Sequence, residues 1–247
     1  MFVAFAVLFY RNLRYRRYLV GYKRGKYNFT DILSLNKMGW MVGLQMGLET
    51  ALFSITGIMI GWLGSIALAA HQVMVAISTL GFMIYYGVGA AVSVRVSNYF
   101  GRQELLHVRR TTMAGFHLIL CLAVCACTVF LFSRELIGYL FTTSEEVIRV
   151  VSTLVYILLA YQFGDALQIT YANSLRGIGD VISMAVISFI GYFLIAMPVC
   201  YICGFVLEWG ITGIWIGYPI GLTLTGVMLC GRYYWKLKTK TQSTEFY

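Results

Sequence analysis

Charged residues and prolines are scarce in this 247-residue sequence. Lysine, arginine, aspartate and glutamate make up 12 % of the chain, about half of the roughly 25 % found in soluble domains. This scarcity, beside 60 % apolar residues, excludes a disordered chain, a coiled coil and nearly all soluble folds. The six cysteines lie in apolar runs, which excludes a disulfide scaffold of the secreted kind. The composition predicts a polytopic membrane protein.

Six apolar segments are long enough to cross a bilayer, which takes about 20 residues each. The segments are residues 35–61, 66–99, 107–132, 147–175, 181–204 and 211–235. They must be helices, because backbone polar groups in lipid have no water to pair with and the runs lack the alternation of strands. The predicted fold is all-α with six transmembrane helices. Residues 1–34 are predicted to be a truncated helix end and a basic loop, 35–238 the transmembrane lobe, and 239–247 a tail.

The basic residues are distributed unevenly between the two ends of these helices. All of the 19 lysines and arginines except Arg134 and Arg149 fall on one side. The positive-inside rule predicts that this side is cytoplasmic, and that both chain termini lie there. The net charge of +9 is therefore explained by membrane orientation. Anionic lipid, and not nucleic acid, is the partner that it indicates.

Two acidic residues, Glu49 and Asp165, lie deep inside predicted transmembrane helices. Glu49 follows Lys37 by about 18 Å of helix and Asp165 precedes Arg176 by about 16 Å, at 1.5 Å per residue. Both acids are therefore near the middle of a hydrocarbon core about 30 Å thick. No lysine or arginine is expected at that depth. Acids in such positions usually mark ion pathways or proton relays, because an unpaired charge there is costly.

Polar neighbours share a helix face with each of these acids. Tyr161 and Gln168 lie one turn before and about one turn after Asp165, and Gln45 lies one turn before Glu49. The sequence predicts an ion site at Glu49 and Asp165, for Na⁺ or a proton, with Tyr161, Gln45 and Gln168 on the polar faces that border a shared cavity. The alternative is that each acid is protonated and hydrogen-bonded to a neighbouring helix.

The sequence contains no pattern typical of catalysis. Nucleophile elbow, Walker loop and HExxH motifs are absent, so we expect no catalytic residues, no cofactor other than the coupling ion, and no enzyme. Cys200 and Cys203 have CxxC spacing, but they lie inside a predicted helix, which favours inert thiols. His71 is interpreted as a structural histidine, with pH sensing as the alternative.

Glycines and prolines indicate where helices pack closely or bend. Two ladders recur every four residues and favour close helix packing within the chain, with a dimer interface as the alternative. They consist of Gly39, Gly43 and Gly47, and of Gly213, Gly217 and Gly221. The two prolines, Pro198 and Pro219, lie inside predicted helices, and each is expected to kink its helix.

Four stretches of the sequence resemble multidrug and toxic compound extrusion (MATE) transporters. Residues 37–49 (KMGWMVGLQMGLE) resemble the seventh helix of that family, and residues 61–72 (GWLGSIALAAHQ) the start of the eighth. The end of the eighth helix resembles residues 89–101 (GAAVSVRVSNYFG), and the tenth helix with its following turn resembles residues 161–180 (YQFGDALQITYANSLRGIGD). The resemblance implies a twelve-helix, two-lobe fold, of which this chain is the C-terminal lobe with the end of helix six. By the same resemblance, we expect the N-terminal lobe to be absent from this chain.

The family resemblance also implies a function. It implies a secondary antiporter that exports cationic or polyphenolic organic compounds in exchange for Na⁺ or H⁺, in the inner membrane of a bacterium. The family's C-lobe cation site corresponds here to Glu49, Asp165 and Tyr161. Two alternatives are a non-transporting membrane scaffold that needs a separate N-lobe, and a lipid-linked sugar flippase of the wider superfamily. The flippase is less favoured because the sequence has no deep basic residue.

Overall fold

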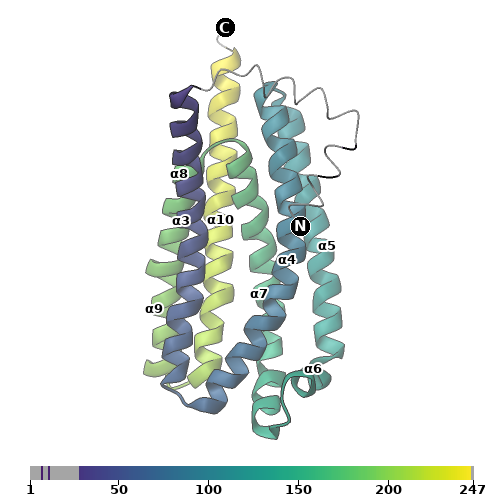
Figure 1. Ribbon diagram of the computed structural model, residues 1–247, viewed down its shortest axis with the longest axis vertical. Coiled ribbons are helices and arrows are strands. Elements are labelled where there is room, and N and C mark those ends of the chain that lie inside the picture. The colour runs from purple at the N-terminus through teal and green to yellow at the C-terminus, as the bar shows by residue number, and fades with distance from the viewer. Residues whose placement is uncertain (1–6, 8–10, 12–27, 246–247) are drawn as a thin grey trace. The chain divides into compact units, whose positions relative to one another are not determined.

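The computed structural model describes residues 7, 11 and 28–245, with side chains as far as residue 240 (Figure 1). It divides into two units, Met1–Trp40 and Met41–Tyr247. Most of the predicted helix end and basic loop before residue 28 lies outside the described residues, as do the last two residues of the predicted tail. In the first unit, helix α3 (Phe29–Gly61) begins after Asn28, whose side-chain oxygen accepts a hydrogen bond from the Thr30 backbone N–H at 3.4 Å.

The second unit contains the rest of α3 and all later helices. The long helices are α4 (Ser65–Gly101), α5 (Leu105–Phe132), α7 (Glu145–Gly177) and α10 (Gly210–Glu245). Another stretch combines α8 (Val181–Phe189), η1 (Ile190–Ala196), α9 (Met197–Tyr201) and η2 (Ile202–Val206). Within residues 28–245, six helical stretches are long and apolar enough to cross a membrane. The prediction of six transmembrane helices in an all-α protein is therefore confirmed.

Helices α7 and α10 pack against each other and hold most of the buried aromatic side chains (Figure 1). Hydrogen bonds fix the register between helices in this interior. Tyr218 pairs with Thr56 of α3 at 2.5 Å, and Tyr233 pairs with Thr112 of α5 at 2.8 Å. Such bonds stabilise helix contacts in a membrane, where packing and polar pairing replace the hydrophobic effect.

The two glycine ladders have different surroundings. On α10, Cβ atoms added to Gly213, Gly217 or Gly221 would overlap Cys203, Cys200 or Ala196 of the neighbouring span. Packing within the chain, as predicted, is therefore the role of this ladder. On α3, Cβ atoms added to Gly43 or Gly47 would meet nothing within 4 Å among the described residues of the second unit. For these two glycines the packing prediction is wrong as far as the described chain is concerned.

Pro198 and Pro219 affect their helices differently. Pro198 lies in α9, between two π-helical segments, so the helical hydrogen-bond pattern changes on both sides of it. Removal of one backbone N–H explains part of this change. Helix α10 continues as α-helix through Pro219.

A short helix, α6 (Arg134–Phe141), connects α5 and α7 at the end opposite to the C-terminal end of α10 (Figure 1). This stretch lies between the predicted spans 107–132 and 147–175, where the sequence analysis predicted no helix. Leu136, Tyr139 and Leu140 are exposed on it, while Ile137 is buried. An apolar exposed face of this kind suits a helix that lies at the membrane surface.

Candidate functional site

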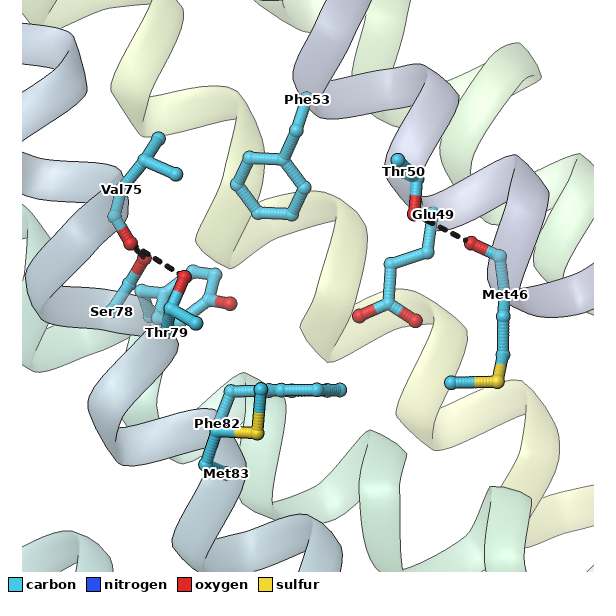
Figure 2. Close-up of a pocket in the computed structure, with 10 residues that line it drawn as sticks. Met46, Glu49, Thr50, Phe53, Val75, Ser78, Thr79, Phe82 and Met83 are labelled. Carbon is cyan, nitrogen blue, oxygen red and sulfur yellow. Dashed lines mark hydrogen bonds between the residues drawn. The ribbon is translucent and has the colours of Figure 1, made fainter.

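The Glu49 side chain lines a cavity between α3 and α4. The cavity has a volume of about 260 Å³. Figure 2 shows the Glu49 carboxylate directed into this space, with Phe53 on one side and Phe82 across from it. The cavity is lined by Met46, Glu49, Thr50, Phe53, Val75, Ser78, Thr79, Phe82, Met83 and Tyr161. Its wall is thus mainly apolar and aromatic, with one carboxyl group.

The hydroxyl groups on the α4 side of the cavity are already used within their own helix. Ser78 and Thr79 both donate to the backbone carbonyl of Val75, at 3.0 and 2.7 Å. This leaves the Glu49 carboxylate as the strongest polar group in the cavity wall.

The Glu49 carboxylate accepts hydrogen bonds from two side chains. Gln45 Nε2 donates to Oε2 over 3.3 Å from one turn earlier on α3. The Tyr192 hydroxyl donates to the same oxygen over 3.4 Å from the π-helical segment η1. Tyr192 in turn accepts a hydrogen bond from Gln168 Nε2 at 2.8 Å. A buried chain of three polar groups therefore connects α7 to Glu49.

The sequence analysis missed Tyr192. The signal was a tyrosine in an otherwise apolar span, since a buried tyrosine hydroxyl normally finds a hydrogen-bond partner. It lies in a π-helical segment, a feature that often marks functional sites. Sequence alone does not show that this hydroxyl faces Glu49, because that depends on how the fifth span packs against α3.

Asp165 lies on α7 and is fully buried, at 0 % exposure. Neither of its carboxylate oxygens has a hydrogen-bond partner among the described residues. It is close enough to Glu49 for the two carboxyl groups to influence each other electrostatically. Tyr161 lines the same cavity as Glu49, and Asp165 lies one helical turn after Tyr161 on α7. The structure therefore brings the three predicted site residues Glu49, Asp165 and Tyr161 into one neighbourhood.

Two other buried polar side chains near Asp165 also lack partners. The Tyr85 hydroxyl and both amide atoms of Gln162 have no hydrogen-bond partner among the described residues. Tyr85 is within electrostatic range of Asp165, and Gln162 precedes Asp165 by three residues on α7. Unpaired buried polar groups are costly. The alternative for Asp165 was a protonated acid hydrogen-bonded to a neighbouring helix. The lack of such a bond among the described residues does not favour that alternative.

Gln45 and Gln168 do not line the large cavity. They border a smaller cavity of about 20 Å³, together with Glu49, Asn173 and Arg176. This volume is sufficient for a single water molecule, which needs about 10–15 Å³. The two cavities are neighbours, because Met46, Glu49 and Phe82 line both of them.

Arg176 reaches this region from the last turn of α7. Its Nη2 donates to Gln45 Oε1 at 3.4 Å, and its Nη1 donates to Asn173 Oδ1 at 3.2 Å and to the Tyr86 hydroxyl at 3.4 Å. The expectation that no basic side chain reaches the depth of the acids therefore needs correction. The long arginine side chain extends inward from the helix end, so a positive charge is connected to Glu49 through Gln45.

The other polar residues that the sequence analysis singled out lie outside this site. His71 is buried against Trp215, with ring centroids 5.8 Å apart, and its Nδ1 has no partner in the described chain. Cys200 packs against Gly217, and both Cys200 and Cys203 are free thiols. Among the described residues, no three His, Cys, Asp or Glu side chains come together as metal ligands would.

An ion pair connects the turn after α7, where Asp180 lies between two membrane-spanning segments, to Arg232 of α10. Arg232 Nε donates to Asp180 Oδ2 at 2.8 Å, and Ser183 Oγ donates to Asp180 Oδ1 at 2.8 Å. Burial alone would raise the pKa of Asp180, but the hydrogen bonds from Arg232 and Ser183 and the charges of Arg232 and Lys236 hold it below its usual value. Asp180 is therefore charged in the folded protein at neutral pH.

Replacing Asp180 by Asn is expected to lower the free energy of unfolding by about 2 kcal/mol at pH 7, the usual value of a hydrogen bond to a charged group. A lowered folded-state pKa stabilises the protein above the unfolded-state pKa, about 3.9 for Asp. That stabilisation disappears as the pH falls through the folded-state pKa. Thermal unfolding in detergent micelles should therefore show the largest difference between wild type and Asp180→Asn at pH 7, and the difference should shrink as the pH is lowered below the unfolded-state pKa.

The matched control is Glu135→Gln, which breaks an exposed ion pair of 3.5 Å with Arg134. Exposed pairs contribute about 0–1 kcal/mol, so this variant should melt close to wild type. Equal melting of Asp180→Asn and wild type at pH 7 would contradict the role given to the Asp180–Arg232 pair.

The helices and the acids in the membrane interior define a multi-pass membrane protein with a polar site between its helices. Residues 42–202 match the MatE family. The chain belongs to this family.

The relatives most informative about this chain are bacterial. It is 34 % identical over 220 residues to the multidrug resistance protein NorM of Photobacterium profundum, covering 87 % of this chain and 47 % of that protein. It is 32 % identical over 214 residues to the NorM of Vibrio cholerae, covering 84 % and 47 %. The chain thus spans about half the length of the relatives that it matches.

Solved structures share the fold. A structure of a MATE transporter in complex with MaL6 matches with a TM-score of 0.81 at 14 % identity, covering 88 % of this chain and 49 % of that one. The eukaryotic MATE transporter AtDTX14 matches with a TM-score of 0.78 at 20 % identity, covering 88 % and 51 %. The six-helix arrangement is therefore that of half a MATE transporter.

Proposed function

We propose that this chain is one lobe of a multidrug efflux antiporter and that Glu49 and Asp165 bind its coupling ion. The observation that carries the proposal is the presence of two acids, Glu49 and Asp165, in the same region of the transmembrane helices. One of them, Glu49, opens onto a cavity, and the other, Asp165, is fully buried without a hydrogen-bond partner. Acids in this position are a default sign of an ion pathway. The relatives named multidrug resistance proteins support the same reading.

The proposed mechanism follows from the cost of charge in a low-dielectric interior. Na⁺ or H⁺ entering from outside neutralises Glu49 and Asp165, and Tyr161 supplies a further oxygen. The neutral pair removes the repulsion between the acids and favours one arrangement of the lobes over the other. When the ion leaves on the cytoplasmic side, negative charge returns to the cavity. An organic cation is then attracted to Glu49 and to the aromatic faces of Phe53 and Phe82.

The cavity also suggests how the transporter is completed. Its volume of about 260 Å³ is below the range of about 300–1,000 Å³ usual for ligand sites. A second six-helix lobe, in the same or another polypeptide, would supply the opposite wall. This proposal agrees with the half-length match to the relatives. The open glycine ladder on α3, including Gly43 and Gly47, suits close approach of another helix.

We place the protein in the inner membrane of a bacterium, with the basic helix ends in the cytoplasm. The excess of lysine and arginine at one end of the helices supports this orientation. The bacterial relatives support the compartment. The substrates in this proposal are small organic cations.

The test is ethidium efflux from drug-sensitive bacterial cells that produce this chain alone or together with the N-terminal lobe of a NorM relative. We expect gradient-dependent efflux when both lobes are present, and the gradient that drives it, of sodium or of pH, identifies the coupling ion. Efflux by the chain alone would show that a second copy of the same chain serves as the second lobe. Absence of efflux with both lobes correctly inserted would contradict the antiporter proposal.

A further inference from the structure

A second large cavity lies between α4 and α5 and shares no lining residue with the Glu49 cavity. It has a volume of about 410 Å³. Arg95 and Arg110 line it toward the end of α4 and the start of α5, and Val88, Ala114 and Leu118 line it farther along these helices. The proposed antiport mechanism uses none of these residues. The cavity therefore needs a separate explanation.

The two arginines present unopposed positive charge to this cavity. Both are exposed, and neither forms an ion pair with an acid in residues 28–240. The adjacent Arg109 is different, because its guanidinium lies over the ring of Tyr234 at 5.7 Å. Two guanidinium groups in one cavity repel organic cations and attract a phosphate, to which arginine donates hydrogen bonds in pairs.

The position of the arginines along their helices matches the level of lipid headgroups. Arg95 lies about 9 Å before the end of α4 at Gly101, and Arg110 about 8 Å after the start of α5 at Leu105, at 1.5 Å per residue. Val88 and Leu118 lie about 10–12 Å deeper in the membrane than the arginines on the same helices. One cavity therefore runs from a charged end at headgroup level to an apolar end beside the acyl chains.

Small residues create this groove. A Cβ atom added to Gly115 would overlap Val92, so α4 and α5 approach each other closely beneath the cavity. Ala91 and Ala114 line it and are exposed, so their short side chains leave room above that contact. The result is a shallow apolar channel between two helices that ends at two arginines.

We propose that this groove binds an anionic diacyl phospholipid. The phosphate contacts Arg95 and Arg110, and one acyl chain lies along α4 and α5 between Val88 and Leu118. Basic pockets between transmembrane helices bind anionic headgroups in this way. A zwitterionic lipid fits less well, because its cationic headgroup would meet the same two arginines. A free phosphate would leave the apolar half of the groove without a ligand.

The test is native mass spectrometry of the purified chain in detergent, titrated with phosphatidylglycerol or phosphatidylcholine of identical acyl chains. Wild type should retain phosphatidylglycerol as a discrete adduct and prefer it to phosphatidylcholine. The Arg95→Gln/Arg110→Gln variant should bind phosphatidylglycerol about 30-fold more weakly, since each basic side chain near an anionic surface adds about fivefold. Its affinity for phosphatidylcholine should be unchanged.

A charge-matched control is Arg102→Gln/Lys238→Gln, which removes two exposed basic residues that do not line the groove. It should bind phosphatidylglycerol like wild type. Ala114→Phe keeps both arginines and fills the apolar part of the groove, so it should lose the lipid as well. If the Arg95→Gln/Arg110→Gln variant does not give a folded, monodisperse sample, the Ala114→Phe variant tests the proposal in its place.

Three results would overturn the proposal. The first is equal loss of phosphatidylglycerol in the control and in the Arg95→Gln/Arg110→Gln variant, which would indicate general charge attraction. The second is full competition by glycerol 3-phosphate, which would assign the site to a soluble phosphate. The third is a dimer that disappears in the groove variants without any change in lipid adducts, which would assign the groove to a second copy of the chain.

Discussion

Asp165→Asn is expected to reduce ion-driven efflux by the completed transporter to the level of cells without it. The substitution keeps the size and shape of the side chain but removes its ability to take up and release a positive charge. Asp165 is fully buried, and neither carboxylate oxygen has a hydrogen-bond partner in the described chain. A permanently neutral residue there holds the site in its ion-loaded state. The efflux rate is measured with sodium and pH gradients imposed separately.

Asp180→Asn provides the matched control for this experiment. It makes the same chemical change in an acid that lies between two membrane-spanning segments and is already ion-paired with Arg232. Efflux by this variant, normalised to the amount of folded protein, should keep its dependence on the ion gradient. If Asp165→Asn and Glu49→Gln both transport at the wild-type rate, the ion-coupling assignment is wrong.

The two acids are not equivalent, and the variants should differ accordingly. Glu49 accepts hydrogen bonds from Gln45 and Tyr192 and opens onto the large cavity. Gln in its place can still accept one of these bonds, and it retains the shape of the cavity wall. We therefore expect Glu49→Gln to bind a cationic substrate more weakly than wild type does, with the shape of the cavity unchanged.

The sequence was sufficient to predict the helices because a bilayer imposes a simple length requirement. Each apolar run is long enough to span, and a backbone in lipid has to satisfy its own hydrogen bonds. The same logic picked out Glu49 and Asp165, since acids in such runs are conspicuous. The observed spans extend beyond the predicted ones by a few residues at most ends, because helices continue into the interface where polar residues are tolerated.

The polar groups around the acids could not be predicted in the same way. Tyr192 and Arg176 contact the site across helix interfaces. The spacing of residues along one helix shows neither which side of that helix faces its neighbour nor how far an arginine side chain extends. Helix α6 was missed because it is too short to span, although its apolar residues set it apart from an ordinary loop. The prediction for the glycine ladders failed on α3 for a related reason. A ladder of small residues shows that a helix can be approached closely, but not which helix does so.

The α10 ladder gives the second large effect, on stability. Gly213→Ala is expected to lower the free energy of unfolding by about 3 kcal/mol, at the upper end of the range for overpacking. The added Cβ atom would overlap the backbone carbonyl group of Cys203 and lie 2.9 Å from the Gly204 backbone nitrogen. Backbone atoms cannot move aside as a flexible side chain can, so α10 has to separate from the fifth span.

Gly231→Ala is the matched substitution on the same helix, and its effect should have the opposite sign. A Cβ atom there would meet nothing within 4 Å among the described residues. Alanine in a helix is favoured over glycine by about 1 kcal/mol, so this variant should be more stable than wild type. Unfolding of both variants is followed by titration of micelles with a denaturing detergent. Equal effects of the two substitutions would show that helix propensity, and not the close packing of α10 against Cys203, governs these positions.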